Sequence, residues 1–369
     1  MGNYNERQRV GILTFHRAIN YGALLQAYAL QEALKKMGCL PEIIDYRSPV
    51  LESQHLEARL SNCQNAKDIA RFIFYAKHQN RKMKIFRDFS AANLNLSDVY
   101  ENTEQLRKIS LEYDKFICGS DQVWNHRITD FDRNYFLDFI EDIAKKNSYA
   151  ASFGISSIPP EHVNEYRNLL KGFNHISVRE NQGRKIINEL VNREAELVLD
   201  PTLLLSKQDW ESIAADYKKK KNYILLYMFG NSLTMKTFVE NLARQTGCEI
   251  VLISYSVIKR INATYEKSVG PAEFLGLFQN ARYVVTNSFH GTCFSLNFNK
   301  DFFLEMLPES QGVNSRLENI LDLFDLRSRQ IISGENANTR KTIDYGEVNK
   351  RLLVERQRSL DFISKIISN

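Results

Sequence analysis

Cysteine is scarce in this sequence, and its spacing excludes two common uses of the residue. The five cysteines among 369 residues are Cys39, Cys63, Cys118, Cys248 and Cys293. No two of them form a CxxC pair, which argues against a zinc site, and the odd, scattered set argues against a disulfide framework. We therefore expect reduced thiols in a cytoplasmic protein.

Long apolar stretches are absent as well. No run approaches the roughly 18 apolar residues that a membrane-spanning helix requires. The polar start MGNYNERQRV lacks the apolar segment of a signal peptide, and Glu6 stands where an N-myristoylation motif needs serine or threonine. These absences predict a cytoplasmic location, with association at the inner face of the membrane as a further expectation.

Neither sign of charge dominates, since 49 Lys and Arg residues face 44 Asp and Glu residues, for a net charge of +5. This mild excess suits an anionic substrate or an anionic membrane surface, and we expect no nucleic-acid partner. The basic and aromatic stretch at 71–89, RFIFYAKHQNRKMKIFRDF, is typical of an amphipathic helix on a membrane surface. A helix with its apolar face in the core and a solvated basic face fits the same pattern, and both interpretations stay open.

Several enzyme motifs are missing. There is no P-loop, no GxSxG, no HExxH and no GxGxxG. Residues 130–132 read Asp-Phe-Asp, similar to the DxD of metal-dependent glycosyltransferases, but a three-residue match is common by chance. The spacing of His16, His126 and His175 does not support a metal site. We therefore expect neither a metal nor a bound cofactor.

Short runs rich in Ile, Val, Leu and Phe alternate with helical patterns along the chain. One series of predicted strands lies at 10–15, 42–46, 115–120, 147–154, 175–180 and 196–205, and a second lies at 223–229, 249–254, 282–288 and 301–306. Apolar strands separated by helices indicate parallel sheets covered on both faces. The sequence therefore predicts an α/β protein with two doubly wound Rossmann-like domains that face a central cleft.

The two series also predict the domain boundaries. We expect one domain over 1–205, a second over 206–345 and a C-terminal helix over 346–369, with the linker near Lys218–Lys221. Ligands of open α/β sheets bind outside the carboxyl ends of the strands. The polar residues at these strand ends are therefore the candidates for function.

The segment NSFHGT at 287–292 ends one strand and begins a helix. A helix N-terminus attracts phosphate groups, and His290 beside it can act as a proton donor or an anion clamp. The alternative is a capping segment with a structural histidine. In SVRE at 177–180, Arg179 ends another strand and suits a bidentate grip on carboxylate or phosphate. The alternative there is an internal ion pair, with Glu180 or with another helix.

Two further strand ends suit a saccharide. In HRAINYGALLQAYAL at 16–30, we expect Asn20 to cap the helix and Gly22 to allow close approach of a ligand. In GSDQVWN at 119–125, the polar side chains suit sugar hydroxyls and Trp124 offers a stacking face. A buried tryptophan beside an Asx-type turn is the alternative for this segment.

Several segments, taken in order, resemble the polysaccharide pyruvyl transferase family. They are GILTFHRAINYGALLQAYAL, FICGSDQVWN, ASFG, ISVRE, VLDPTLLL, GPAEFLGLFQNARYVVTNSFHGTCFSLNFNKDFF and NSRLENIL, all within residues 10–325. The resemblance implies a glycosyltransferase-B-like architecture. It also implies phosphoenolpyruvate as donor and a pair of hydroxyls on a surface polysaccharide or its precursor as acceptor, with lipid-linked acceptors included. The implied product is a cyclic pyruvate ketal, with release of phosphate.

The resemblance also implies roles for single residues. The histidine before glycine in the family corresponds to His290, and its strand-end arginine corresponds to Arg179, so both are expected to be catalytic. Beyond what the resemblance implies, we expect the C-terminal domain to bind the donor, with Ser288, Gly291, Thr292, Lys300 and Arg316. We expect the N-terminal domain to bind the acceptor, with Asn20, Gly22, Ser120, Asp121, Gln122, Trp124 and Asn125.

One segment departs from the family pattern. Many members carry Arg-Leu-His-Gly where this chain has Ser-Phe-His-Gly at 288–291. Serine lacks the charge that helps to hold phosphoenolpyruvate, so either Arg316, Lys300 or Arg282 compensates or the donor differs. Two other functions stay open on the same architecture: a nucleotide-sugar-dependent glycosyltransferase, and a saccharide-binding protein without catalysis.

Overall fold

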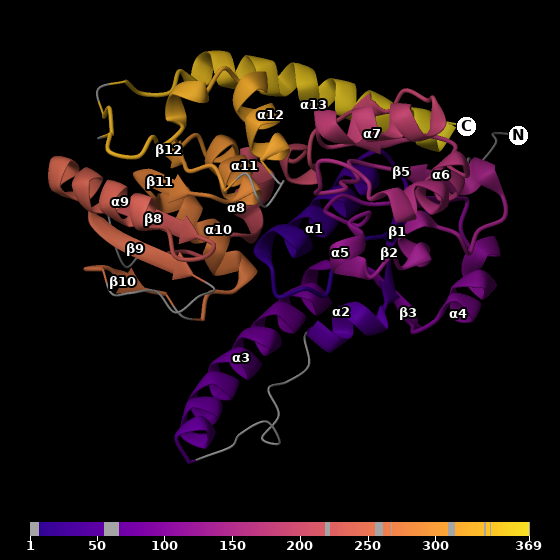
Figure 1. Ribbon diagram of the computed structural model, residues 1–369, viewed down its shortest axis with the longest axis horizontal. Coiled ribbons are helices and arrows are strands. Elements are labelled where there is room, and N and C mark those ends of the chain that lie inside the picture. Colours follow the sequence, from indigo (N-terminus) through magenta and orange to yellow (C-terminus); the bar gives the residue numbers. More distant parts are fainter. Residues whose placement is uncertain are drawn as a thin grey trace, which may run out of the picture. The chain divides into compact units, whose positions relative to one another are not determined.

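The computed structural model describes residues 7–54, 66–217, 222–254, 261–266, 268–308, 314–335, 337–339 and 341–368. The expected linker, Lys218–Lys221, lies outside these ranges. The chain forms two compact units: the first unit comprises residues 1–59, 90–205 and 355–369, and the second comprises residues 60–89 and 206–354 (Figure 1). This division differs from the expected one in two places, because residues 60–89 belong with the second unit and the C-terminal helix is divided between the units.

The first unit is built on a parallel five-stranded sheet. Its strands are β1 (Arg9–Leu13), β2 (Leu40–Tyr46), β3 (Leu96–Tyr100), β4 (Lys115–Cys118) and β5 (Lys146–Ser148), in the order β3-β2-β1-β4-β5. Its helices are α1 (Tyr21–Lys36), α2 (Pro49–Gln54), α4 (Thr103–Lys108), α5 (His126–Thr129), α6 (Val163–Lys171) and α7 (Asn181–Val191). A small parallel pair, β6 (Ser177–Val178) and β7 (Glu196–Leu197), completes it.

The second unit repeats this topology. Its strands are β8 (Tyr223–Met228), β9 (Glu249–Ser254), β10 (Thr264–Tyr265), β11 (Tyr283–Thr286) and β12 (Asp301–Leu304), in the order β10-β9-β8-β11-β12. Its helices are α8 (Lys207–Ile213), α9 (Leu233–Thr246), α10 (Pro271–Asn280), α11 (Phe289–Asn297) and α12 (Ser315–Leu323). The long helices α3 (Ala66–Asn93) and α13 (Tyr345–Ser368) contribute residues to both units.

Both sheets therefore have the same order when their strands are counted from the start of each unit: third, second, first, fourth, fifth. This is the order of a Rossmann-like half, and it confirms the predicted α/β class with two doubly wound units. The direction of winding reverses between the first and fourth strands, and ligands of such sheets bind there, outside the carboxyl ends. The switch points are thus β1/β4 in the first unit and β8/β11 in the second.

Several predicted strands are shorter than expected. The run 196–205 contains only the two-residue β7, followed by a short 3-10 helix over Pro201–Leu203, because Asp200 caps the turn and Pro201 begins it. Likewise, 147–154 contains only the end of β5. The edge strands β3 and β10 were not predicted. The backbone of α3 confirms a helix through 71–89, but side chains are described only from residue 80, and of these Phe86 and Phe89 are buried.

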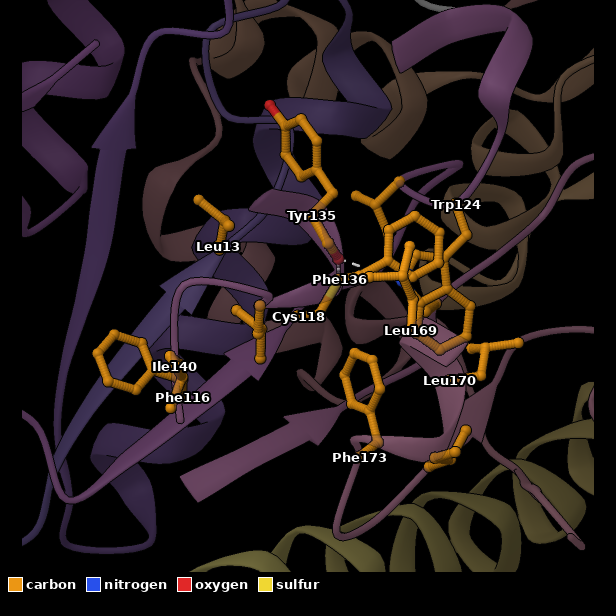
Figure 2. Close-up of a cluster of buried hydrophobic side chains, with 14 of the residues drawn as sticks. Leu13, Phe116, Cys118, Trp124, Tyr135, Phe136, Ile140, Leu169, Leu170 and Phe173 are labelled. Carbon is orange, nitrogen blue, oxygen red and sulfur yellow. Dashed lines mark hydrogen bonds between the residues drawn. The ribbon is translucent and has the colours of Figure 1, made fainter. Parts of the chain in front are cut away.

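Aromatic side chains hold the segment after β4 in the core of the first unit (Figure 2). The Trp124 ring stacks on Phe136 with centroids 5.7 Å apart, and its Nε1 donates to the Tyr135 carbonyl oxygen at 3.1 Å. The Cys118 thiol, at the end of β4, donates to the same carbonyl at 2.8 Å. These contacts fix the loop that carries Asp121 and Gln122 at the β1/β4 switch point.

Candidate functional site

The β1/β4 switch point of the first unit is bound together by buried polar contacts. Thr14, which follows β1, donates from Oγ1 to the carbonyl oxygen of Ser120, which follows β4, at 2.7 Å. The Gln26 amide on α1 donates to the same Thr14 oxygen at 2.9 Å. The two loops and the first helix are therefore held in one arrangement, as a preformed ligand site requires.

Arg179 lies beside Ser120 at this switch point and forms ion pairs with carboxylates of the same unit. Its Nη1 lies 2.7 Å from Asp200 Oδ2, and its Nη2 lies 3.7 Å from Asp121 Oδ1. Burial alone would lower the pKa of Arg179, but the charges of Asp200, Asp121 and Glu180 outweigh it and raise the pKa further above its ordinary value. The guanidinium stays charged and anchors Asp121, so the structure places it in an internal ion pair.

The expected acceptor residues separate into two groups. Asn20, Asp121 and Gln122 line one cavity of about 180 Å³ at the switch point, together with His16, Arg17 and Tyr135. Ser120 lies outside its lining, where its hydroxyl donates to Asp200 Oδ2 at 2.9 Å. Gly22 lies in the first turn of α1 and donates its backbone N–H to Asn20 Oδ1 at 2.9 Å, which confirms the predicted cap.

Trp124 and Asn125 have structural positions. The Trp124 side chain is fully buried in the aromatic cluster, so its ring offers no face to a sugar, and the expectation of a stacking platform is corrected in favour of the buried alternative. Asn125 caps the short helix α5, because its Oδ1 accepts from the backbone N–H of Arg127 at 3.0 Å. Its Nδ2 donates to Gln122 Oε1 at 2.9 Å and so fixes the orientation of that amide.

Charged residues of one wall of the cavity form pairs. His16 Nε2 lies 3.2 Å from Asp45 Oδ1, and Arg17 pairs with Glu52 at 2.6 Å and approaches Asp45 at 3.6 Å. Burial would raise the pKa of Asp45, but the hydrogen bond from His16 and the charges of His16, Arg17 and Arg47 outweigh it and lower the pKa. These residues and Tyr135 were not assigned from the sequence, although the segment at 16–30 contains His16 and Arg17.

The β8/β11 switch point of the second unit carries the expected donor residues. Ser288 caps α11, since its Oγ accepts from the Gly291 N–H at 3.2 Å, while the Thr292 N–H and hydroxyl donate to the Ser288 carbonyl at 3.0 and 3.1 Å. The amides of Gly291 and Thr292 are therefore engaged within the helix and do not clamp a ligand. His290 lies in the first turn, with 8% of its surface exposed.

Gly291 is required for packing at this turn. A Cβ added there would lie 2.5 Å from Thr286 Oγ1 and 3.0 Å from the Tyr227 ring. Thr286 in turn donates to the Tyr227 carbonyl oxygen at 2.8 Å, which joins β11 to β8. The glycine lets α11 begin directly on the sheet and so holds the backbone of His290 at the strand end.

The three cations named as substitutes for the missing arginine lie in different places. The Arg316 guanidinium carbon lies 5.9 Å from the centre of the ring of Phe289, which precedes His290 in the sequence. Lys300 follows α11 and precedes β12, and Arg282 precedes β11, so both lie at the amino edge of the sheet. The structure therefore brings Arg316, and neither of the others, to the end of α11 that carries His290.

Glu305 also lies at this carboxyl edge and was not assigned from the sequence. It follows β12, and its Oε1 accepts from the Ser232 hydroxyl at 2.7 Å. Burial raises the pKa of Glu305. Its signal in the sequence was its position after the run DFFL, the same kind of strand end that identified His290.

No three or more His, Cys, Asp or Glu side chains among the described residues are grouped so that they could hold a metal ion. In the same ranges, none of the helices combines the length and the apolar character that crossing a membrane would need.

Lys82 belongs to the basic stretch at 71–89 that was considered for a membrane surface. Burial lowers the pKa of its amino group to about 8.

The chain was compared with known proteins. A profile of the polysaccharide pyruvyl transferase family matches residues 20–304, and no curated protein matches. Among solved structures, the UDP-GlcNAc 2-epimerase of Methanocaldococcus jannaschii, in complex with UDP-GlcNAc and UDP, has a TM-score of 0.48 at 14% identity, over 98% of this chain and 99% of that one. The S. aureus MnaA–UDP structure has a TM-score of 0.48 at 12% identity, over 97% and 91%. The glycosyltransferase SnogD from Streptomyces nogalater has a TM-score of 0.43 at 10% identity, over 98% and 99%.

Proposed function

Because the chain belongs to the polysaccharide pyruvyl transferase family, we propose that it transfers the pyruvyl group of phosphoenolpyruvate to a saccharide. Two hydroxyls of one sugar of a surface polysaccharide, or of its precursor, receive the group. A cyclic ketal forms and inorganic phosphate is released. Phosphoenolpyruvate acts as co-substrate, and the proposal involves neither a bound cofactor nor a metal. Lipid-linked saccharides are included among the acceptors, in the cytoplasm or at the inner face of the membrane, where residues 71–89 are the candidate contact.

The observation that carries this proposal is the contact of Arg316 with Phe289, the residue that precedes His290 at the start of α11. His290 lies in the first turn of α11, and the Arg316 guanidinium lies over the ring of the adjacent Phe289. A histidine and an arginine together suit a small ligand that carries both a carboxylate and a phosphate. Arg316 is therefore our candidate for the charge that Ser288 lacks.

The chemistry proceeds by proton transfer and two additions at one carbon. A proton, for which His290 is the candidate donor, adds to the methylene carbon of phosphoenolpyruvate and makes C2 electrophilic. One sugar hydroxyl adds to C2 and loses its proton, giving a tetrahedral intermediate that still carries phosphate. The phosphate leaves with the electrons of its C–O bond, and the second hydroxyl adds and loses its proton, which closes the ketal.

The acceptor side is proposed for the first unit. Asp121 can accept a hydrogen bond from a sugar hydroxyl, and Arg179 and the backbone N–H of Gln122 orient its carboxylate. Arg179 is thus a positioning residue in the proposal, since the 2.7 Å ion pair with Asp200 already engages it. Positioning and charge stabilisation supply most of the acceleration in such a scheme.

The test is phosphate release from phosphoenolpyruvate in the presence of a panel of saccharide acceptors, with the ketal product identified by mass spectrometry. The His290→Ala variant is expected to lose about 10²- to 10⁴-fold in rate, the usual range for removal of a general acid or base. A His162→Ala variant serves as the matched control, because His162 lies in the first unit near α6.

Two results would contradict the proposal. One is near-normal phosphate release by His290→Ala when circular dichroism shows a native fold. The other is a wild-type enzyme that releases no phosphate with any acceptor but does consume a sugar nucleotide.

A further inference from the structure

The cavity at the β1/β4 switch point is lined by a hydroxyl that the protein does not use. Tyr135 is 2% exposed and lines the cavity. Its carbonyl oxygen accepts from Trp124 and Cys118, so the residue is firmly placed. In Figure 2 its hydroxyl points away from the other labelled side chains. Across the ranges that the structure describes, no group forms a hydrogen bond with that hydroxyl.

The hydroxyl faces the open space of the cavity and can therefore form a hydrogen bond with a ligand there. Replacing Tyr135 with phenylalanine would remove this group without changing the packing of the ring. Its position on a cavity wall therefore points to a ligand that supplies the missing partner.

Two amide groups of the same cavity have orientations that hydrogen bonds fix. Asn20 Oδ1 accepts from the N–H groups of Gly22 and Ala23, so its Nδ2 is left as a donor. The Asn125 amide donates to Gln122 Oε1, so the Nε2 of Gln122 is left as a donor too. The cavity thus offers two amide donors and a phenol, and the second carboxylate oxygen of Asp121 offers an acceptor.

The charges around the cavity are balanced. Arg17 is paired with Glu52 and Asp45, and Asp121 is paired with Arg179. A phosphate placed here would face the carboxylates of Asp121 and Glu52. The hydroxyls of an uncharged polyol can both accept hydrogen bonds from the amide donors and donate them to the carboxylate. The chemistry therefore favours a neutral, hydroxyl-rich ligand over an anion.

The size of the cavity sets a limit on that ligand. Its volume is about 180 Å³, and a cavity of about 150 Å³ is enough to hold benzene. Pockets for drug-sized ligands are larger, at about 300–1,000 Å³. One six-membered ring matches this volume, and a longer saccharide would extend beyond the cavity.

We propose that this cavity is a subsite for a single uncharged sugar ring, with Tyr135 as a specificity-determining residue. The Tyr135 hydroxyl and the amides of Asn20 and Gln122 bond ring hydroxyls, and Asp121 accepts from one of them. The identification of this ring as the pyruvylated acceptor rests on the proposed function. Binding of the ring itself needs no donor and can be measured separately.

The experiment titrates the whole protein with methyl glucoside, methyl galactoside and methyl mannoside at millimolar concentrations, using ligand-observed NMR without phosphoenolpyruvate. Saturable binding of at least one of them to the wild type is expected. Tyr135→Phe should weaken it about tenfold, the equivalent of one well-placed hydrogen bond of about 1.4 kcal/mol, and should leave the melting temperature unchanged.

Tyr113→Phe is the matched control, because the Tyr113 hydroxyl donates to Glu42 within the same unit. That variant should be less stable than the wild type and bind the sugar equally well. A merely structural Tyr135 would give the opposite result, with lower stability and unchanged binding.

Three results of the binding experiment overturn the proposal: no saturable binding of any of the three sugars, equal binding by wild type and Tyr135→Phe, or preferential binding of inorganic phosphate. Other results would distinguish failure of the proposed function from failure of the subsite. Binding that depends on Tyr135, without phosphate release from phosphoenolpyruvate, would support the subsite and contradict the pyruvyl transfer. Phosphate release with an unchanged KM for the acceptor in Tyr135→Phe would contradict the subsite alone.

Discussion

Arg179 lies in the segment SVRE, yet the carboxylate that holds it, Asp200, lies 21 residues further along the chain. The sequence marked Arg179 as a strand-end residue but placed Asp200 inside the predicted strand 196–205, and only the folded chain brings the two within 2.7 Å. An arginine at a strand end suits a ligand and an ion pair equally well. The local sequence could therefore identify the position but not the partner.

Tyr135 shows the converse limit. It lies in a short 3-10 helix over Arg133–Phe136, outside the strand ends from which the sequence predicted binding residues. Its role is inferred from an unused hydroxyl on the wall of a cavity, which is a property of packing. By contrast, Asn20, Asp121 and Gln122 were predicted from their strand ends and do line the cavity.

Asp45 carries the pH prediction at this scale. Its pKa is lower in the folded protein than its ordinary value of 3.8, so its contribution to stability is fully present above that pH and is lost as the pH falls through the lower, folded value. Asp45→Asn should cost about 1.5–3 kcal/mol at neutral pH, the range for hydrogen bonds to charged groups. The difference from wild type should shrink below pH 3.8.

Urea denaturation of wild type and Asp45→Asn, at neutral and at acidic pH, measures the difference in their free energies of unfolding. Asp98→Asn, an exposed carboxylate on β3, is the control and should change little at either pH. A penalty for Asp45→Asn that is the same at both pH values would contradict the assignment of an ionised, paired Asp45.

At the scale of the elements, helix starts were predicted better than strand lengths. Asn20 caps α1 as expected, because capping depends on one side chain and the first turn after it. The strands β3 and β10 were missed, since both are edge strands with partly exposed residues and lack a continuous apolar run. The run at 196–205 was predicted too long, because apolar residues fill the loop around Asp200-Pro201 as well as the strand.

The capping amide of α1 allows helix stability and ligand binding to be separated. Asn20→Ala removes both the cap and the free donor, and it should cost about 1 kcal/mol of stability as well as affinity for the sugar. Asn20→Asp keeps the capping oxygen but loses the Nδ2 donor. It should therefore retain the stability of the wild type within a few tenths of a kcal/mol and lose affinity.

Thermal denaturation and the sugar titration, run on both variants, make this comparison. Equal affinity of Asn20→Asp and wild type would show that the side chain serves the helix alone. Lower stability of Asn20→Asp, equal to that of Asn20→Ala, would contradict the assignment of Oδ1 as the capping atom.

At the scale of the whole molecule, the two series of strands correctly predicted two units with parallel sheets. The interleaving of the chain was not predicted, because the unit that a helix joins depends on tertiary contacts. The last part of α13 packs with the first unit: Arg356 donates to the carbonyls of Leu203 and Leu205 at 2.8 and 3.1 Å. Ser359 Oγ accepts from the Leu199 N–H at 3.0 Å, and the Phe362 ring lies 6.4 Å from that of Tyr149.

Substitution of Phe362 tests whether the last part of α13 stabilises the first unit. Its side chain is 3% exposed, and Phe362→Ala should cost about 3–5 kcal/mol, as is usual for a large buried aromatic residue. Hydrogen exchange followed by mass spectrometry should show the loss in β1 and β4, with β8 and β11 protected as in wild type. Leu353→Ala, at a position of the same helix that is 61% exposed, is the control.

A loss of protection in β8 and β11 that is as large as that in β1 and β4 would contradict the assignment of this part of α13 to the first unit. So would a Phe362→Ala variant whose exchange matches that of Leu353→Ala throughout.

The division of α13 also has a consequence for the order of events during synthesis. The first unit takes residues 355–369 into its core, whereas the second is complete at residue 354. At about 5–20 residues per second, β1 leaves the ribosome roughly 20 to 70 seconds before α13 does. The unit whose strands are translated first is therefore the unit whose fold is completed last, because its apolar strands are made before the helix that packs on them.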